Sequence, residues 1–345
     1  MKKVLVTGGS GYIGSHTLVD LTENGYEVIS VDDLSRGNER LIYGASKITE
    51  KVIKNYKVDL CNLEDTRAIF EENTDIVGII HFAAFKSVGE SVNSPLLYFR
   101  NNITSLLNIL HCAKEYNVKN IVFSSSCSVY GNADTLPVSE TTPLKPVESP
   151  YARTKVFGEE ICADFIQANP EHKVILLRYF NPVGAHPSSL IGEFNEKPEN
   201  LVPVITQTAI GIRKSMSVFG NDYPTKDGSC IRDYIHVLDI ANAHTKAITK
   251  SLEEAIPSRC EIFNLGTGNG VSVLELIKAF EATTNIKLNY EIAPRRAGDV
   301  ISVYADNSKA KNILGWEIKY NITQMMKTAW DWEKKLDNDK KAFLN

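Results

Sequence analysis

A tyrosine and a lysine four residues apart, Tyr151 and Lys155, are the pair in this chain best suited to acid–base chemistry. Pro150 favours the start of a helix just before them, so the two side chains should lie one turn apart on the same face. An ammonium ion close to a phenol lowers the tyrosine pKa toward neutrality, which would make Tyr151 a usable general base. Because this spacing arises by chance in many helices, it needs support from elsewhere in the sequence.

A run of hydroxyl groups supplies part of that support. Residues 120–123 read as a strand, and Ser124-Ser125-Ser126 follows directly. Ligands bind at the carboxyl ends of the strands in parallel α/β sheets, so these hydroxyls are placed to meet a ligand. Taken alone, the segment could also be a plain serine-rich turn. The Tyr151–Lys155 pair is what favours a catalytic serine.

The element that must position these groups begins near the N-terminus. The apolar strand Val4-Leu5-Val6 leads into Gly8, Gly11 and Gly14, and a helical pattern follows. In such a turn one glycine permits the bend, one lets backbone N–H groups approach a pyrophosphate, and one lets the helix lie close to the strand. The helix N-terminus then favours the phosphates electrostatically. The segment predicts a dinucleotide site.

An acidic residue ends the second strand, at residues 27–31. Asp32 stands about 20 residues after the glycine turn, where a carboxylate accepts hydrogen bonds from the adenosine ribose. It would also repel a 2′-phosphate, so NAD is favoured over NADP. Arg36 is the nearby residue that would favour NADP instead. Asp32 could otherwise be a solvated turn residue.

Strands and helices continue to alternate after Asp32. Residues 56–60 and 76–80 read as strands, and residues 63–72 and 95–116 as helices. This alternation predicts an α/β fold, a doubly wound parallel sheet of the Rossmann type with a smaller mixed α/β C-terminal substrate domain. We expect an NAD-binding domain at 1–180 and a mainly substrate-binding domain at 181–345, with some later strands and helices returning to the first. The residues from about Lys334 are expected to fray.

Composition excludes several functions. The 38 basic and 42 acidic residues give a net charge of −4, so no overall basic field would recruit nucleic acid or an anionic membrane. No metal-binding grouping of histidines is present, and no stretch of roughly 18 apolar residues could span a membrane. The apolar run after Lys3 breaks too early for a signal peptide. Six cysteines without close pairs then predict reduced thiols and a cytoplasmic enzyme.

At this point the sequence resembles the extended short-chain dehydrogenase/reductase superfamily and, within it, the UDP-glucose 4-epimerase family. The glycine turn and the Ser124–Gly131 segment are typical of the superfamily. The segments typical of the epimerase family are 149–155, 178–187, 219–228, 232–237, 263–266 and 293–299. Cys127 is a departure, because that family often has alanine there. The resemblance runs nearly end to end.

The resemblance implies a mechanism. Tyr151 would take the proton of the sugar 4-hydroxyl while the 4-hydride passes to tightly bound NAD, Ser126 would bond the same oxygen, and Lys155 would bind the nicotinamide ribose. The 4-keto sugar would then turn over and take the hydride on its other face. These three residues and the following would line the cofactor: Gly8, Gly11, Tyr12, Ile13, Gly14, Asp32, Asp33, Leu34, Ser35, Arg36, Gly37, Asp59, Leu60, Phe82, Ala83, Ala84, Phe85, Lys86, Asn101 and Phe180. From the residues alone, the small side chains of 82–86 could equally be core packing.

The resemblance also implies substrate contacts with UDP-hexoses. Besides Ser126 and Tyr151, they would come from Lys86, Asn181, Asn200, Ser217, Val218, Phe219, Arg232, Arg296, Asp299 and Val303. Guanidinium groups suit a diphosphate, although either arginine alone could be an ordinary surface residue. Val303 stands where family members limited to plain sugars have tyrosine, so activity on UDP-GlcNAc and UDP-GalNAc is expected as well. A homodimer through the helices at 95–116 and 151–169 is also implied.

Two other classes of protein share parts of this pattern. A nucleotide-sugar 4,6-dehydratase has the same fold and Tyr-Lys pair, but it needs an acid and a base after the strand-end hydroxyl, where this chain has Cys127 and Ser128. A non-catalytic NAD-binding regulator would keep the glycine turn without Ser126, Tyr151 and Lys155. The sequence favours the epimerase over both.

Overall fold

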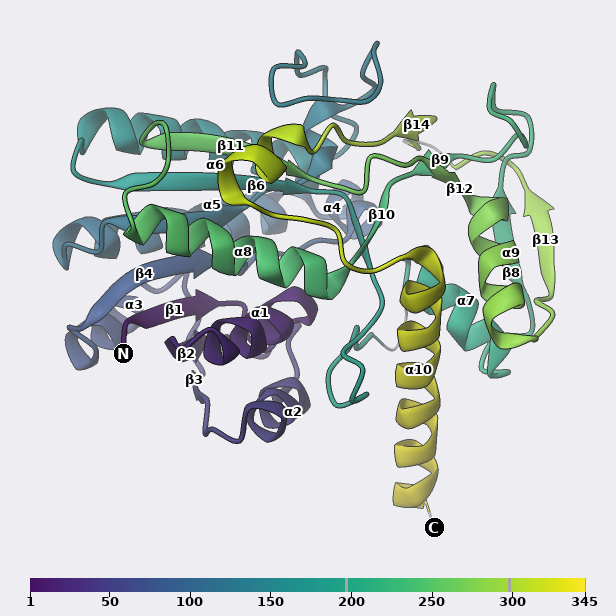
Figure 1. Ribbon diagram of the computed structural model, residues 1–345, viewed down its shortest axis with the longest axis horizontal. Helices are drawn as coiled ribbons and strands as arrows, with labels where there is room; N and C mark the ends of the chain where they lie inside the picture. The colour runs from purple at the N-terminus through teal and green to yellow at the C-terminus, as the bar shows by residue number, and fades with distance from the viewer. Residues whose placement is uncertain (196–197, 297–298, 345) are drawn as a thin grey trace.

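A seven-stranded parallel sheet forms the centre of the protein in the computed structural model, which describes residues 1–195, 198–296 and 299–344 (Figure 1). The strand order is β11-β6-β5-β4-β1-β2-β3. The strands are β1 Lys3–Thr7, β2 Glu27–Val31, β3 Lys54–Tyr56, β4 Ile76–His81, β5 Asn120–Ser124, β6 Lys173–Tyr179 and β11 Cys260–Leu265. The order reverses direction next to β1, which is where ligands bind in doubly wound sheets.

Helices cover both faces of this sheet, as a parallel sheet requires. One layer holds α1 Tyr12–Glu23, α2 Glu39–Thr49 and α8 Val237–Leu252, and the other holds α3 Leu63–Glu72, α5 Pro95–Glu115 and α6 Pro150–Ala168. Successive residues of each strand point to opposite layers: Val4 and Val6 pack in one apolar core, whereas Leu5 packs in the other. The predicted α/β fold class is confirmed.

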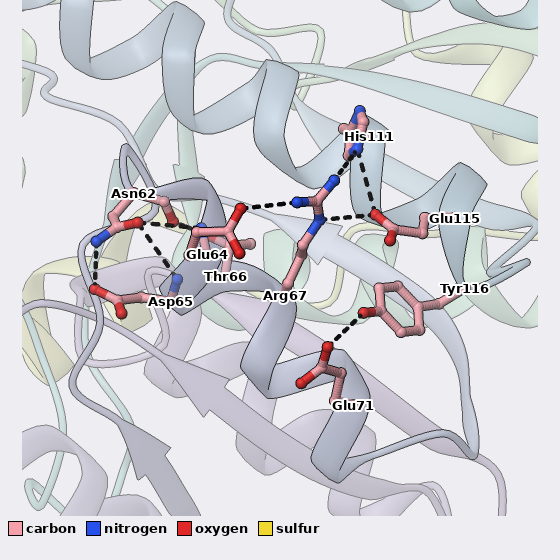
Figure 2. Close-up of polar contacts among 9 residues, drawn as sticks. All are labelled: Asn62, Glu64, Asp65, Thr66, Arg67, Glu71, His111, Glu115 and Tyr116. Atoms are coloured by element: carbon pink, nitrogen blue, oxygen red, sulfur yellow. Dashed lines mark hydrogen bonds and ion pairs between the residues drawn. The ribbon is translucent and has the colours of Figure 1, made fainter.

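Polar contacts hold α3 against α5 (Figure 2). The side chain of Asn62 caps the start of α3 by accepting bonds from two backbone N–H groups. Arg67 then contacts three side chains, pairing with Glu64 and Glu115 at 2.8 and 2.9 Å and lying 2.9 Å from the imidazole of His111. These contacts help to fix α5, the helix that carries Asn101 toward the carboxyl edge of the sheet.

The second half of the chain builds a smaller unit of short strands and helices, together with α8 and β11 of the main sheet. Its two-stranded sheets pair β7 Asn181–Val183 with β10 Tyr234–His236, and β8 Met216–Phe219 with β13 Tyr290–Ala293. A three-stranded sheet joins β12 Val271–Ser272, β9 Ile231–Arg232 and β14 Ser302–Val303. Three helices, α7 Leu201–Ala209, α9 Val273–Thr284 and α10 Ile322–Leu344, pack on these strands around their own apolar core (Figure 1).

Two local predictions were wrong. The third strand covers 54–56 rather than 56–60, because the Val58 N–H bonds back to the Tyr56 carbonyl and the chain then turns toward α3. The residues from Lys334 continue helix α10 to Leu344 instead of fraying. Ion pairs of Asp339 with Arg40 and Lys335 tie that last part of the helix to α2 and to itself. Within the described ranges, no helix is long and apolar enough to cross a membrane.

Candidate active site

A cleft of about 620 Å³ opens at the carboxyl ends of β1, β2 and β4. Most of the residues predicted to hold the cofactor line it, and so do four predicted substrate residues: Lys86, Tyr151, Asn200 and Arg296. Ten predicted site residues are outside this lining: Leu34, Ser126, Phe180, Asn181, Ser217, Val218, Phe219, Arg232, Asp299 and Val303. The structure therefore gathers the predicted cofactor residues in one place.

The glycine turn is shaped for a close approach of backbone and ligand. Gly8 has φ 69°, and a Cβ there would lie 2.9 Å from the backbone nitrogen of Ala83. A Cβ on Gly14 would collide with the Gly8 carbonyl oxygen. Gly11, the residue before helix α1, provides no side-chain cap, so the first N–H groups of the helix remain available to an anion. These features fit the pyrophosphate of a dinucleotide.

Asp32 lies at the end of β2, beside that turn. Its carboxylate accepts hydrogen bonds from the backbone N–H of Ser10 at 3.1 Å and of Leu34 at 2.9 Å, and burial raises its pKa. A Cβ on Gly37 would lie 2.6 Å from the same carboxylate. The carboxylate is thus held in place with lone pairs left for a ribose.

Arg36, the residue that would favour NADP, is already engaged. Its guanidinium pairs with Glu90 at 2.5 Å and lies 5.1 Å from the centre of the Phe85 ring. Glu90 also accepts a 2.8 Å hydrogen bond from Tyr98. A 2′-phosphate would have to compete with this carboxylate for the arginine.

The three predicted catalytic residues converge at the carboxyl end of β5. Ser126 caps a short 3-10 helix, Cys127–Tyr130, and accepts a bond from the Ser128 N–H at 3.2 Å. Tyr151 and Lys155 project from the first turns of α6, and both are buried. The ammonium of Lys155 donates a 2.6 Å hydrogen bond to the carbonyl of Ser124. The end of β5 and the start of α6 are therefore joined by a direct hydrogen bond.

The predicted lowering of the Tyr151 pKa is wrong for the protein as it stands here. Burial raises the pKa of this phenol well above its usual value, and a hydrogen bond with Ser126 offsets only part of that effect. Burial also lowers the pKa of Lys155 to about 8. The reason is that Lys155 points to the Ser124 carbonyl, so the dry surroundings dominate over any attraction between ammonium and phenol.

Several residues that the sequence did not reveal complete the cleft. Glu193 pairs with Lys86 at 3.0 Å and accepts a 2.8 Å bond from Asn200, joining two sides of the opening. Tyr179 accepts a bond from the Ser124 hydroxyl at 2.8 Å. Asn102 bonds both the N–H and the C=O of Phe85, at 2.8 and 3.1 Å. The polar Asn102 within an apolar helix was the one sequence signal among them.

The two predicted phosphate clamps meet at one carboxylate. Arg296 donates a 2.7 Å hydrogen bond to Asp299, and Arg232 approaches the same oxygen at 3.7 Å. Arg232 extends from β9, whereas Arg296 and Asp299 belong to the loop before β14. The structure thus brings together two guanidinium groups from distant parts of the sequence.

Three further predicted substrate residues belong to β8, and the ring of one of them, Phe219, lies close to the clamp. In β8, Val218 is buried in the core, whereas Ser217 and Phe219 are more exposed, and Arg296 lies 5.6 Å from the centre of the Phe219 ring. Asn181 donates its backbone N–H to Asp233. Phe180 is buried behind the cleft, so its contact with a cofactor stays a prediction.

Comparison with known proteins shows which family this chain belongs to. The sequence pattern of the family described as GDP-mannose 4,6 dehydratase matches residues 5–329. The chain is 47% identical to UDP-glucose 4-epimerase of Bacillus subtilis, over 96% of both chains. It belongs to the UDP-glucose 4-epimerase family. The resemblance predicted from the motifs is therefore confirmed.

Solved structures of family members have the same fold. The epimerase of Stenotrophomonas maltophila, with bound NAD and formylated UDP-arabinopyranose, has a TM-score of 0.94 at 42% identity, covering 98% of this chain and all of that one. The UDP-Glc/GlcNAc 4-epimerase of Campylobacter jejuni has a TM-score of 0.83 at 38% identity, covering 97% and 100%. The similarity to named epimerases supports the epimerase and not the dehydratase alternative, in agreement with Cys127 and Ser128 after the strand-end serine.

The family resemblance links Val303 to the range of sugars that the protein accepts, and packing and strand pairing fix the place of this residue. Its side chain is 6% exposed and packs with Phe180 and Val129, close to the turn that carries Ser126. Parallel pairing with Arg232 in β9 fixes its register. The ring of the neighbouring Tyr304 lies over Gly270 instead, so it does not occupy the position of Val303.

Proposed function

We propose that the protein is an isomerase that interconverts UDP-galactose and UDP-glucose with bound NAD. The observation that carries this proposal is the convergence of Ser126, Tyr151 and Lys155 beside a cleft shaped for a dinucleotide. The diphosphate clamp of Arg232 and Arg296 gives the site a second, substrate-binding side. Similarity to known epimerases over the whole chain supports the same conclusion.

Each catalytic side chain has a role that its position supports. When bound, NAD supplies the hydride acceptor and donor that protein side chains lack. Tyr151 would accept the proton of the sugar 4-hydroxyl, and Ser126 would hold the same oxygen, since the two hydroxyls already interact. Lys155, fixed by the Ser124 carbonyl, would bind the nicotinamide ribose and favour the phenolate when charged.

Purified protein incubated with UDP-galactose should form UDP-glucose, and the reverse, without added NAD. A 4,6-dehydratase would instead release water and yield a 4-keto-6-deoxy sugar nucleotide, and a regulator would leave the sugar unchanged. Either of those results would overturn the proposal. Separation of the sugar nucleotides by chromatography distinguishes all three.

We expect the cofactor released from the purified protein to be NAD, in at least about tenfold excess over NADP, or ~1.4 kcal/mol. The physical reason is the fixed carboxylate of Asp32 together with the capture of Arg36 by Glu90. Mass analysis of the released cofactor provides the measurement. Replacing Asp32 with serine should lower the ratio of bound NAD to NADP. A predominance of NADP in the unaltered protein would contradict the predicted preference for NAD.

The proposed activity covers both plain and N-acetylated UDP-sugars. Valine at 303 is smaller than the tyrosine expected in family members limited to plain sugars, and a pocket enlarged in this way still accepts a smaller substrate at a loss of only about 1 to 3 kcal/mol. A relative described as acting on both UDP-Glc and UDP-GlcNAc is 38% identical to this chain. We therefore propose activity on UDP-GlcNAc and UDP-GalNAc as well.

The helices α5 and α6 carry exposed apolar side chains that suit a homodimer. Leu96 is 81% exposed and Phe157 40% exposed, and Phe157 lies 6.0 Å from Phe99 between the ring centres. We propose a homodimer through this face. The six cysteines are free thiols, which suits a reducing compartment, and we propose a cytoplasmic location.

Replacing Phe157 with glutamate should weaken the dimer at least about tenfold, because an unpaired carboxylate in a dry interface costs several kcal/mol. Light scattering over a range of protein concentrations would show the mass fall from two chains to one. Val52, 96% exposed and distant from these helices in the sequence, offers a control: its change to glutamate should leave the mass unaltered. A Phe157→Glu protein that keeps the two-chain mass would refute this interface.

A further inference from the structure

A chain of buried hydrogen bonds runs beneath the catalytic residues. Glu159 accepts a 2.5 Å bond from the Ser125 hydroxyl and two bonds from the guanidinium of Arg178, at 2.8 and 2.5 Å. Arg178 also donates to the Tyr130 hydroxyl at 3.0 Å, which in turn donates to Asn264 at 2.7 Å. Ser125 directly follows β5, and the other groups lie on α6, β6, the 3-10 turn and β11, so the chain joins five segments beneath the catalytic residues.

Glu159 stands one helical turn beyond Lys155 and two turns beyond Tyr151 on α6. Lys155 and Glu159 hold neighbouring residues of the β5 end, the first through the Ser124 carbonyl and the second through the Ser125 hydroxyl. The strand end that leads into Ser126 is therefore fixed to α6 at two consecutive positions. A change at Glu159 would reach Ser126 and Lys155 together.

The surroundings of Lys155 contain few groups that could balance its charge. The titratable groups of the elements packed against it are Tyr151, Glu159 and Cys162 of α6, Arg178 and Tyr179 of β6, His81 of β4 and Cys260 of β11. Burial raises the pKa of both tyrosines and both cysteines, which disfavours their anions, and it lowers the pKa of His81 to about 3, which keeps that imidazole neutral near pH 7. Among these groups, Glu159 supplies the carboxylate, which is paired with the guanidinium of Arg178.

We propose that Glu159 is a positioning residue for the epimerisation, whose carboxylate keeps Lys155 charged in a dry interior while holding the Ser124–Ser126 strand end against α6. The inference rests on the proposed function. Arg178 balances the charge of Glu159 and presents it in a fixed, bidentate geometry. The Glu159–Arg178 pair therefore acts in the reaction as well as in the packing of the fold.

The test is the pH dependence of the Glu159→Gln variant. Burial lowers the pKa of Lys155 to about 8, and the charge of Glu159 acts against that effect. Removing the charge should lower the pKa further, so the basic limb of kcat/KM should move to lower pH, by about one unit. The pH above which the protein loses NAD on desalting should move in the same direction, and this readout needs no epimerase activity.

Three further variants keep the result interpretable. Ser125→Ala and Arg178→Lys leave the Glu159 carboxylate in place. The basic limb of kcat/KM in these two variants should therefore lie at the same pH as in the unaltered protein, even if activity falls. The double variant Glu159→Gln with Arg178→Gln leaves no unpaired buried charge, and the basic limb of its kcat/KM profile should move to lower pH by less than that of Glu159→Gln, because the lost guanidinium repelled the Lys155 ammonium while the lost carboxylate attracted it. A folded Glu159→Gln or double variant with both the limb and the NAD-release pH unmoved would overturn the proposal. An unaltered protein that does not epimerise would instead overturn the proposed function, while the NAD-release shift still tests Glu159.

Discussion

Replacing Tyr151 with phenylalanine should slow epimerisation by about 10² to 10⁴-fold while NAD stays bound, because the change removes only the proton acceptor. The tyrosine ring is buried in the first turn of α6, so phenylalanine can keep the same packing. The glycine turn between β1 and α1 and Asp32 just after β2, which would hold the cofactor, are untouched. The measurements are kcat on UDP-galactose and the NAD content of the purified variant.

A matched control comes from an exposed tyrosine on α2. Tyr43 is 64% exposed and loses the same hydroxyl in Tyr43→Phe, which should turn over at the normal rate. A Tyr151→Phe protein with near-normal kcat would show that another group accepts the proton. Loss of NAD together with activity would show that the hydroxyl serves cofactor binding instead.

Val303→Tyr should abolish activity on UDP-GalNAc and UDP-GlcNAc, by at least about 10²-fold, while activity on the plain sugars changes by no more than about tenfold. A rigid pocket can reject an oversized substituent almost completely, whereas an unfilled gap weakens binding only modestly. Val303 is held in a closely packed cluster with Phe180 and Val129, so the added ring has little room to turn aside. The comparison is kcat/KM on UDP-GalNAc and UDP-galactose for both proteins.

Val303→Ile is the appropriate control, because it adds one methylene without the ring and should leave both activities. An unaltered protein that ignores the acetylated sugars would show that other walls of the pocket exclude them. A Val303→Tyr variant that still processes both sugars would show that residue 303 is not the gate.

Local sequence was sufficient for the core of the fold and for many of the residues that line the cleft. The turn at Gly8, Gly11 and Gly14, the strand ending at Asp32, and the helix opened by Pro150 are all determined by backbone preferences over a few residues. Continuous apolar strands alternating with helical periods predicted the buried parallel sheet, because both faces of such strands must be covered. Segments typical of the epimerase family then identified the family, which the comparisons confirmed.

The electrostatics of the site depended on the tertiary structure. Spacing placed Tyr151 and Lys155 on one face of a helix, but only the folded chain directs Lys155 to the Ser124 carbonyl and buries the phenol, so that its pKa rises. The same holds for the Glu159–Arg178 pair and for Asp299 between its two arginines, whose partners come from different elements. A pKa or an ion pair reflects every group within a few ångströms, and residues far apart in the sequence supply those groups. Local patterns therefore determined which residues could do the chemistry, and long-range packing decided their charge and their partners.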